Sequence, residues 1–321
     1  MKSLFAVVFI LLSANSNAYS SRIVHNDCTC ATELQEKLDN DARDMNDFYH
    51  NKFDSYVKID NDAEFLEGSN KENAIILIHG FIASPFEVRA VAKRLNEIGY
   101  TVYMPLLYGF GADGQTANAG KLSIWREQIK AAVKSLSGCY KKISLGGISL
   151  GAALATDYVL KTHDPKISSL VLMSPYYDIS QSVAKLIVGP LSSVKDSFDL
   201  STLFTVSHSD DLVEILKFKR YYSNIMPFNT LQELFKFSDE LKAKESVTKS
   251  NVPVFLAYSE FDTTINLETA DSLPRKHFNN VQLFKLPKEL KVPHQITYAS
   301  SNPRFDEMLR KIAHFIGVSN F

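Results

Sequence analysis

The sequence has few cysteines, a single tryptophan and no excess of charge of one sign. Its 321 residues include three cysteines, and 35 basic residues balance 36 acidic ones. Three cysteines have neither the number nor the spacing for a metal site. Lys and Arg are dispersed, so no basic run can neutralise several phosphates. The composition therefore argues against nucleic acid as a partner and against a cysteine-bound metal.

No apolar run is long enough to cross a membrane. The longest, Leu4 to Leu12, falls well short of the roughly 20 residues needed. It follows Lys2 and precedes small residues, with Ser16 and Ala18 at the −3 and −1 positions of a cleavage site. This three-part pattern predicts a signal peptide over residues 1–18 and export to a periplasm or out of the cell. The alternatives are an uncleaved anchor and a buried core helix.

Export places the cysteines in an oxidising compartment. Cys28 and Cys30 are too close in sequence to pair with each other without strain, but either can pair with Cys139. Such a bond would join an N-terminal extension to the main domain. The alternative is three free thiols, because sequence alone does not give connectivity.

Strand and helix patterns alternate from residue 73 onward. Continuous apolar runs, typical of strands buried on both faces, alternate with amphipathic stretches. Pro85 and Gly99 bracket the first of the helices, as expected for its start and end. The expected strands are 74–78, 101–105, 142–145, 169–173, 252–258 and 281–286, and the expected helices are 85–98, 122–136, 152–160 and 305–316.

This alternation predicts an α/β fold, with a mostly parallel central sheet and helices on both faces. The pattern stops over 176–245, which holds no clear buried strand but has amphipathic stretches at 212–222 and 230–241. We interpret this segment as an inserted helical cap over the carboxyl ends of the strands. The core is then 73–175 and 246–321, and 19–72 is an N-terminal extension. In that extension we expect a helix over 33–53 and one or two short strands within 56–66.

The central motif is Gly147-Ile148-Ser149-Leu150-Gly151, between an expected strand and an expected helix. A nucleophile elbow needs this setting, because its tight turn raises the serine hydroxyl and leaves room only for small residues on either side. The helix N-terminus also favours developing negative charge. We therefore interpret Ser149 as a nucleophile. The alternative is a glycine-rich turn with a buried serine.

A second motif, His79-Gly80-Phe81, follows the first strong strand. Acyl transfer needs two backbone amides that bind the oxyanion, one from this loop and one from the residue after the nucleophile. We assign these amides to Phe81 and Leu150, with Gly80 allowing the loop to pass close to the substrate. The alternative is that His79 and Gly80 merely end a strand.

A triad also needs a carboxylate and a histidine. Asp262 follows a late strand and is the expected acid, with Glu260 and Asp178 as rivals. His294 alone among eight histidines lies between the last strand and the closing helix, so it is the expected general base. The alternatives are that Asp262 is a loop carboxylate exposed to solvent and that His294 is a surface histidine with ordinary hydrogen-bond partners.

These residues resemble those of the bacterial carboxylesterase and monoacylglycerol lipase group of the α/β-hydrolase superfamily. The resemblance covers about residues 73–317 and is strongest in four stretches: 79–81 with Ser84-Pro85, 147–151, Asp262 with Ile265, and 294–297. It implies the α/β-hydrolase fold, a small helical cap, and an ester substrate whose acyl chain lies in an apolar pocket.

Three features depart from that group. Gly109-Phe110-Gly111 replaces its Gly-His-Gly turn, Val292-Pro293 replaces small polar residues before the histidine, and the extension over 19–72 has no counterpart. These departures bear on substrate identity and not on the triad.

The hypothesis is therefore a serine hydrolase that cleaves a small-molecule or lipid ester and needs no metal or cofactor. There are two kinds of alternative. One is a peptidase or a thioesterase with the same triad, and the other is a non-catalytic binding protein of this fold. The oligomeric state is not indicated. Apolar residues of the insert either wall an acyl pocket or pack the cap onto the core: Leu186, Ile187, Val188, Leu191, Phe198, Leu203, Phe204, Phe218, Tyr221, Tyr222, Met226 and Phe228.

Overall fold

The computed structural model describes residues 31–181, 197–199, 221–222, 225–245 and 248–317. The expected signal peptide, Cys28, Cys30 and the stretch 212–220 lie outside these residues. Within them, no helix is long and apolar enough to span a bilayer.

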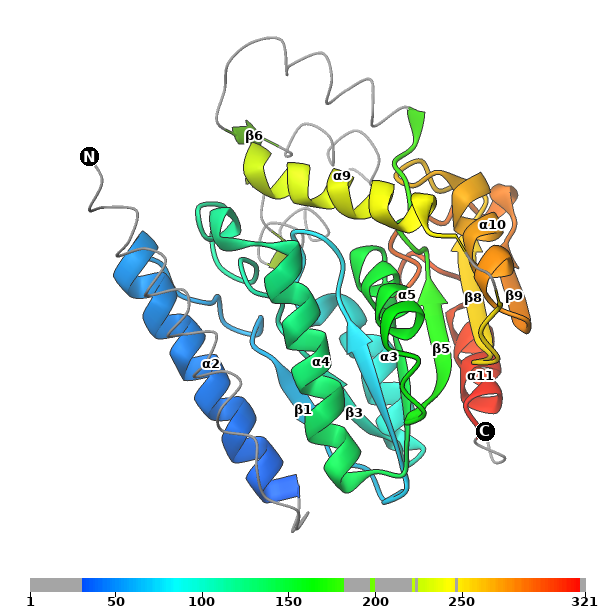
Figure 1. Cartoon of the computed structure of the whole chain (residues 1–321), viewed down its shortest axis with the longest axis horizontal. Coiled ribbons are helices and arrows are strands. Elements are labelled where there is room, and N and C mark those ends of the chain that lie inside the picture. The colour runs from blue at the N-terminus through cyan, green and yellow to red at the C-terminus, as the bar shows by residue number, and fades with distance from the viewer. Residues whose placement is uncertain (1–30, 182–196, 200–220, 223–224, 246–247, 318–321) are drawn as a thin grey trace.

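A seven-stranded sheet forms the centre of the molecule (Figure 1). The strand order is β1-β3-β2-β4-β5-β8-β9, and only β1 runs antiparallel to its neighbour. The predicted mostly parallel sheet is thus confirmed. The strands are β1 (Glu64–Leu66), β2 (Asn73–Ile78), β3 (Thr101–Met104), β4 (Lys142–Ile148), β5 (Ile167–Met173), β8 (Val254–Ser259) and β9 (Val281–Leu286).

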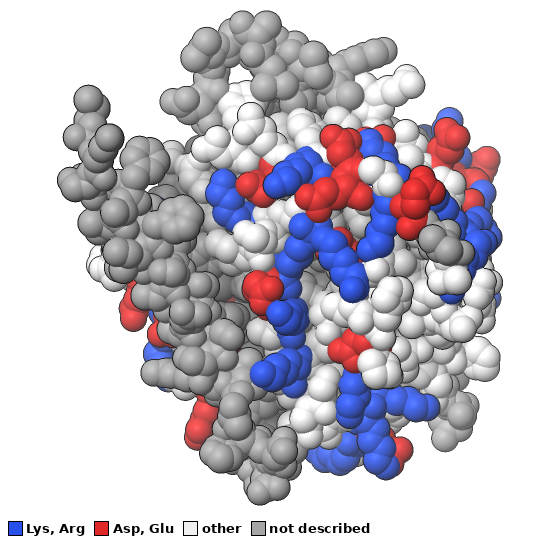
Figure 2. Space-filling model, in the orientation of Figure 1, with Lys and Arg blue, Asp and Glu red and all other residues white. Residues whose placement is uncertain are grey.

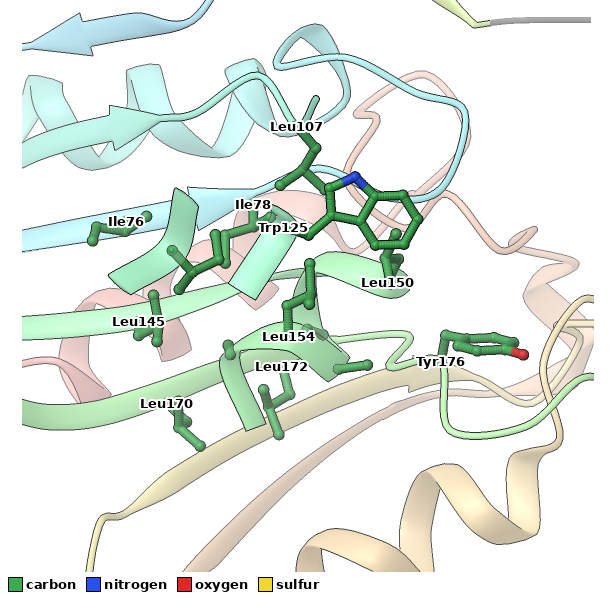
Figure 3. Packing of buried hydrophobic residues seen from close by; sticks show 14 of the residues in the cluster. Ile76, Ile78, Leu107, Trp125, Leu145, Leu150, Leu154, Leu170, Leu172 and Tyr176 are labelled. Carbon is green, nitrogen blue, oxygen red and sulfur yellow. The ribbon is translucent and has the colours of Figure 1, made fainter. Parts of the chain in front are cut away.

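Both faces of the sheet are covered because its central strands are apolar on both sides. In β2, Ile76 and Ile78 join one hydrophobic cluster, and Ile75 and Leu77 join the other. Helices α4 (Leu122–Cys139), α5 (Leu150–Thr162) and α10 (Leu267–His277) pack in the first cluster, and α3 (Phe86–Glu97) and α11 (Phe305–Phe315) in the second. Figure 3 shows Leu145 of β4, Leu154 of α5 and Leu172 of β5, which all belong to the first cluster.

The N-terminal extension packs against the core. Its helix α2 (Ala31–Phe53) lies beside α4 in Figure 1 and buries Leu34, Leu38 and Tyr49. Near the start of α2, Lys37 Nζ donates a hydrogen bond to Ser135 Oγ of α4 at 2.7 Å. The helix expected over 33–53 is therefore present, and the one or two strands expected within 56–66 are the single strand β1.

The insert between β5 and β8 contains a helix, α9 (Phe228–Ala243), as expected for 230–241. Thr230 donates a hydrogen bond to the Ala117 carbonyl at the 3-10 turn Thr116–Ala119. The insert also contains an antiparallel strand pair, β6 (Ser197–Asp199) with β7 (Ile225–Pro227). This pair was not predicted from the sequence, because two strands of three residues leave no measurable periodicity.

Charges on the face seen in Figure 2 are intermixed, with acidic and basic side chains side by side. Arg126 of α4 illustrates the pattern, because it pairs with Asp157 of α5 and Glu240 of α9. Among the described residues visible on this face, neither sign of charge forms a large continuous patch.

Candidate active site

Ser149 stands at a sharp bend between β4 and α5. Its backbone has φ 54° and ψ −119°, a conformation that non-glycine residues rarely adopt. The Ser149 amide donates to the Met173 carbonyl at 3.0 Å, which ties the bend to the end of β5. Strain of this kind persists only where the surrounding structure enforces it, and it concentrates at functional sites.

Two glycines make this bend sterically possible. A Cβ added at Gly147 or at Gly151 would lie 2.1 Å from the Ile78 carbonyl oxygen at the end of β2. No side chain fits there, so the elbow presses directly against the strand that leads into the 79–82 loop. The small-residue requirement inferred from the motif is thus visible as a backbone contact.

Asp262 and His294 form a hydrogen-bonded pair. His294 Nδ1 lies 2.6 Å from Asp262 Oδ2, and both side chains are buried. The other carboxylate oxygen of Asp262 accepts hydrogen bonds from the amides of Thr264 and Ile265, which orient it. Because an ionised carboxylate only accepts, Nδ1 carries the hydrogen and leaves Nε2 available as a base.

Neighbouring carboxylates make His294 a stronger base than an ordinary histidine. Burial by itself lowers its pKa, but the neighbouring carboxylates of Asp262 and Glu87 outweigh burial, so the pKa of His294 is raised. A base with this environment accepts a proton more readily than a buried imidazole without carboxylate partners.

The two rival acids lie elsewhere. Glu260 pairs with Lys285 of β9 at the surface, and its side chain is 41% exposed. Asp178 accepts from the amide of Ile179 and pairs with Lys242 of α9. Of the three carboxylates considered from the sequence, Asp262 is the one the structure brings to His294.

His79 is a structural residue of the 79–82 loop. Its Nε2 accepts from the Leu107 amide at 3.0 Å, so Nδ1 carries the hydrogen and donates to the Gly80 carbonyl at 2.8 Å. Complete burial lowers the pKa of His79 to about 4, which keeps the ring neutral. The imidazole therefore joins this loop to the segment after β3 and is not placed to act as a base.

The Phe81 amide, the first of the two expected to bind an oxyanion, lies in the same loop. Ile82, a β-branched residue, has φ 56°, so the backbone around Phe81 is bent tightly. In the part of the chain that the structure describes, the Phe81 amide donates to no protein acceptor. The second amide, that of Leu150, is the first of α5, where helix amides lack intrahelical acceptors.

Aromatic rings pack behind this loop. Phe110, at the position where the resembling group has histidine, lies edge-on to His79 and Phe81 and stacks on Trp125. Phe110 is buried, so the departure from the Gly-His-Gly turn replaces a polar side chain with part of the core. The hydroxyl of Tyr49 accepts from the Gly109 amide at 2.6 Å, which connects helix α2 to this turn.

Gly80 lies between Ser149 and a carboxylate that the sequence analysis missed. A Cβ at Gly80 would lie 3.2 Å from Ser149 Cβ and 2.9 Å from Glu87 Oε2. Glu87 in turn interacts electrostatically with His294. The residues after β2, β4, β8 and β9 thus meet at one edge of the sheet, as the topology predicts.

Ser259 is a second residue that sequence reasoning missed. Its hydroxyl donates to the Val292 carbonyl at 2.6 Å and so fixes the loop that carries His294 to the end of β8. Ser259 begins the stretch that contains Asp262 but was given no role there, and Glu87 belongs to no motif. An acidic residue in the first turn of a helix, like Glu87 in α3, is ordinary, so no pattern marked it.

Within the described residues there is no group of three or more His, Cys, Asp or Glu side chains that would hold a metal ion. The site contains a serine hydroxyl at the bend after β4 and a hydrogen-bonded imidazole–carboxylate pair.

The fold and this arrangement define an α/β-hydrolase. The profile of the family described as serine aminopeptidase, S33, matches residues 69–294. The chain therefore belongs to this family of α/β-hydrolases.

Individual relatives agree with this assignment. A thermostable monoacylglycerol lipase from Bacillus sp. (strain H-257) is 27% identical over 127 residues, which are 40% of this chain and 50% of that protein. A carboxylesterase from Bacillus subtilis (strain 168) is 24% identical over 203 residues, 62% of this chain and 76% of that protein. The chain thus spans only about half the length of the first of these relatives.

Solved structures show the same fold. A soluble variant of monoglyceride lipase from Saccharomyces cerevisiae, in complex with a substrate analog, superimposes with a TM-score of 0.66 at 16% identity, covering 80% of this chain and 91% of that one. At this level of identity the likeness shows the fold alone.

Proposed function

We propose that the protein is a carboxylic ester hydrolase that forms an acyl-enzyme on Ser149. The observation that carries the proposal is the buried Asp262–His294 pair at the sheet edge where the strained Ser149 also stands. The names of the monoacylglycerol lipase and carboxylesterase relatives support an ester or a lipid as the substrate class.

The reaction has two halves. Ser149 Oγ attacks the ester carbonyl while His294 Nε2 takes the hydroxyl proton, and Asp262 stabilises the imidazolium. The amides of Phe81 and Leu150 bind the oxyanion of the tetrahedral intermediate. His294 returns the proton to the departing alkoxide, which leaves as an alcohol. Water, deprotonated by His294, then attacks the acyl-enzyme; the bond between the acyl carbon and Ser149 Oγ breaks, His294 returns the proton to Ser149 Oγ, and the acid is released. The proposal includes no metal or cofactor.

The insert is the proposed source of acyl-chain contacts. Most of the apolar residues considered for this role, those from 186 to 191, 203, 204 and 218, lie outside the described residues. Tyr221, in contrast, stacks on Phe86 of α3, and Tyr222 bonds to Glu87. Phe228 packs against the first hydrophobic cluster, the one that contains Ile76 and Ile78. These three residues join the insert to the core.

Amide hydrolysis is a second candidate, because the family carries the description serine aminopeptidase. A series of p-nitrophenyl esters of rising acyl length, assayed beside an aminoacyl p-nitroanilide, ranks the two. We expect ester kcat/KM to exceed that for the anilide and to fall by about 10⁴-fold or more in Ser149→Ala. Faster hydrolysis of the anilide would make the protein a peptidase. Ester turnover that survives Ser149→Ala would contradict the proposal.

A further inference from the structure

A buried carboxyl group lies beside the proposed oxyanion loop. Glu87 is in the first turn of α3, and only 3% of its surface is exposed. Its Oε2 accepts from the Gly80 amide at 2.6 Å. Its Oε1 accepts from the Tyr222 hydroxyl at 2.8 Å. A buried carboxyl group is costly unless each oxygen has a partner, and here both have one.

Tyr222 extends this network to a third segment. Its hydroxyl lies 2.7 Å from the hydroxyl of Tyr298, which follows His294 by four residues in the same loop. Next to it, the rings of Tyr221 and Phe86 stack at 3.4 Å. One carboxyl group therefore connects the 79–82 loop, the insert and the loop that carries His294.

The charges around Glu87 include the proposed base. The titratable groups that interact with it are His294 and Tyr222, and Tyr298 is reached through Tyr222. Burial raises the pKa of Glu87, while the Gly80 amide, Tyr222 and His294 oppose this effect. Glu87 accepts from two buried donors, the Gly80 amide and the Tyr222 hydroxyl, which an apolar side chain of similar volume would leave without a partner. The two donors belong to the 79–82 loop and to the insert, so the carboxyl group fixes the position of one relative to the other.

We propose that Glu87 is a positioning residue of the reaction, one that fixes the loop bearing the Phe81 amide and aligns it with the insert and the histidine loop. This inference rests on the proposed ester hydrolysis at Ser149. Glu87 acts through Gly80, whose neighbours are Ser149 on one side and the Glu87 carboxyl on the other. An oxyanion amide contributes only when it is held in place before the charge develops.

Three variants separate this role from a purely structural one. Glu87→Met keeps the volume but removes the acceptor for the Gly80 amide, so we expect kcat for a p-nitrophenyl ester to fall by about 10- to 100-fold with little change in KM. Glu87→Gln restores an acceptor oxygen and should recover most of that loss. Glu97→Gln, at the exposed end of the same helix, is the control and should keep wild-type kinetics.

The pH profile supplies an independent readout. The charge of Glu87 helps to raise the pKa of His294, so Glu87→Gln should move the acidic limb of kcat/KM to lower pH. Tyr222→Phe removes one donor and tests the network if Glu87→Met does not fold.

Labelling by a fluorophosphonate separates failure of this inference from failure of the proposed function. A wild-type protein that is not labelled at Ser149 refutes both. A wild-type protein that is labelled, together with folded Glu87→Met or Tyr222→Phe variants of unchanged kcat and pH profile, refutes the role of Glu87 alone. A rise in KM without loss of kcat would also overturn it.

Discussion

Positive backbone φ angles recur at the strand ends around Ser149. Three of the described non-glycine residues with positive φ lie there: Ile82 (56°), Ser149 (54°) and Ser174 (40°). Each follows one of the adjacent strands β2, β4 and β5. Such conformations cost about 1–3 kcal/mol each, so the packing beneath them must supply that free energy. Figure 3 shows part of this packing, in which Ile78, Trp125 and Leu150 belong to one buried hydrophobic cluster.

The contact between the elbow and β2 leads to a stability prediction. Gly151→Ala places a methyl group 2.1 Å from the Ile78 carbonyl oxygen, so we expect the free energy of unfolding to fall by about 3 kcal/mol or more. Gly138→Ala in α4 meets no atom within 4 Å and should stabilise the helix by up to about 1 kcal/mol. Urea unfolding followed by circular dichroism measures both. Equal stability of Gly151→Ala and wild type would contradict the contact.

The Asp262–His294 pair leads to a kinetic prediction. Asp262→Asn keeps the size but favours the wrong tautomer of His294, so kcat for an ester should fall by about 10³- to 10⁴-fold. Glu260→Gln changes an exposed ion pair with Lys285 and should leave kcat within about twofold. A larger loss in Glu260→Gln than in Asp262→Asn would transfer the role of the acid to Glu260.

At this scale the sequence led to residues that sit in motifs and missed those that do not. The place of Ser149 follows from spacing within a five-residue pattern, and that of His294 from its position between the last strand and the closing helix. Glu87 and Tyr222 are 135 residues apart, and their contact depends on how the insert packs. No local pattern encodes such a contact.

Among the elements, strands and helices that bury an apolar face were predictable. The sequence placed β2 within one residue, because its continuous apolar run is typical of a strand covered on both sides. It ended β4 at Leu145, three residues early, since Gly146 and Gly147 are poor strand formers. The glycines are there because Gly147 must pass close to the Ile78 carbonyl, a tertiary requirement.

Helix α10 was missed although a local signal marks its start. Asn266 caps it by accepting hydrogen bonds from the Glu268 and Thr269 amides, and Glu268 lies in its first turn. Pro274 inside the helix weakened the pattern, because proline is typical of a helix boundary. Here the cap was the more informative of the two signals.

Helix α2 connects the extension to the site, and this connection is testable. Tyr49→Phe removes the acceptor for the Gly109 amide and the donor to the Phe110 carbonyl. We expect the free energy of unfolding to fall by about 1–3 kcal/mol, since buried backbone groups lose their partner. Tyr56→Phe, at a ring that is 58% exposed, is the matched control and should have no measurable effect. Thermal unfolding compares the two variants. Equal Tm values for Tyr49→Phe and Tyr56→Phe would show that α2 does not support this turn.

For the whole molecule, a covalent link accompanies the packing of α2. Cys139 at the end of α4 is disulfide-bonded, which was one of the two alternatives that the sequence left open, and the chain's only other cysteines are Cys28 and Cys30. Both Cys28 and Cys30 lie outside the described residues, so either of them can be the partner of Cys139. A disulfide suits an oxidising compartment, which supports the proposal that the chain is exported after removal of residues 1–18.

This link leads to a prediction about the whole fold. Cys139→Ser should lower the free energy of unfolding by about 2–4 kcal/mol in urea titrations without reductant. Of Cys28→Ser and Cys30→Ser, one should match Cys139→Ser and the other should match wild type. Three alkylatable thiols in protein purified from an oxidising compartment would contradict the link, and an intact segment 1–18 in the same preparation would contradict removal of a signal peptide.

The central claim is that Ser149 is a nucleophile activated by His294, and active-site labelling tests it most directly. The folded protein is treated with a fluorophosphonate, digested and mapped by mass spectrometry. The account predicts one phosphonylated residue, Ser149, with labelling that is absent in Ser149→Ala and slowed by orders of magnitude in His294→Ala. An unlabelled Ser149 in folded wild-type protein, or labelling that proceeds at the same rate without His294, would contradict it.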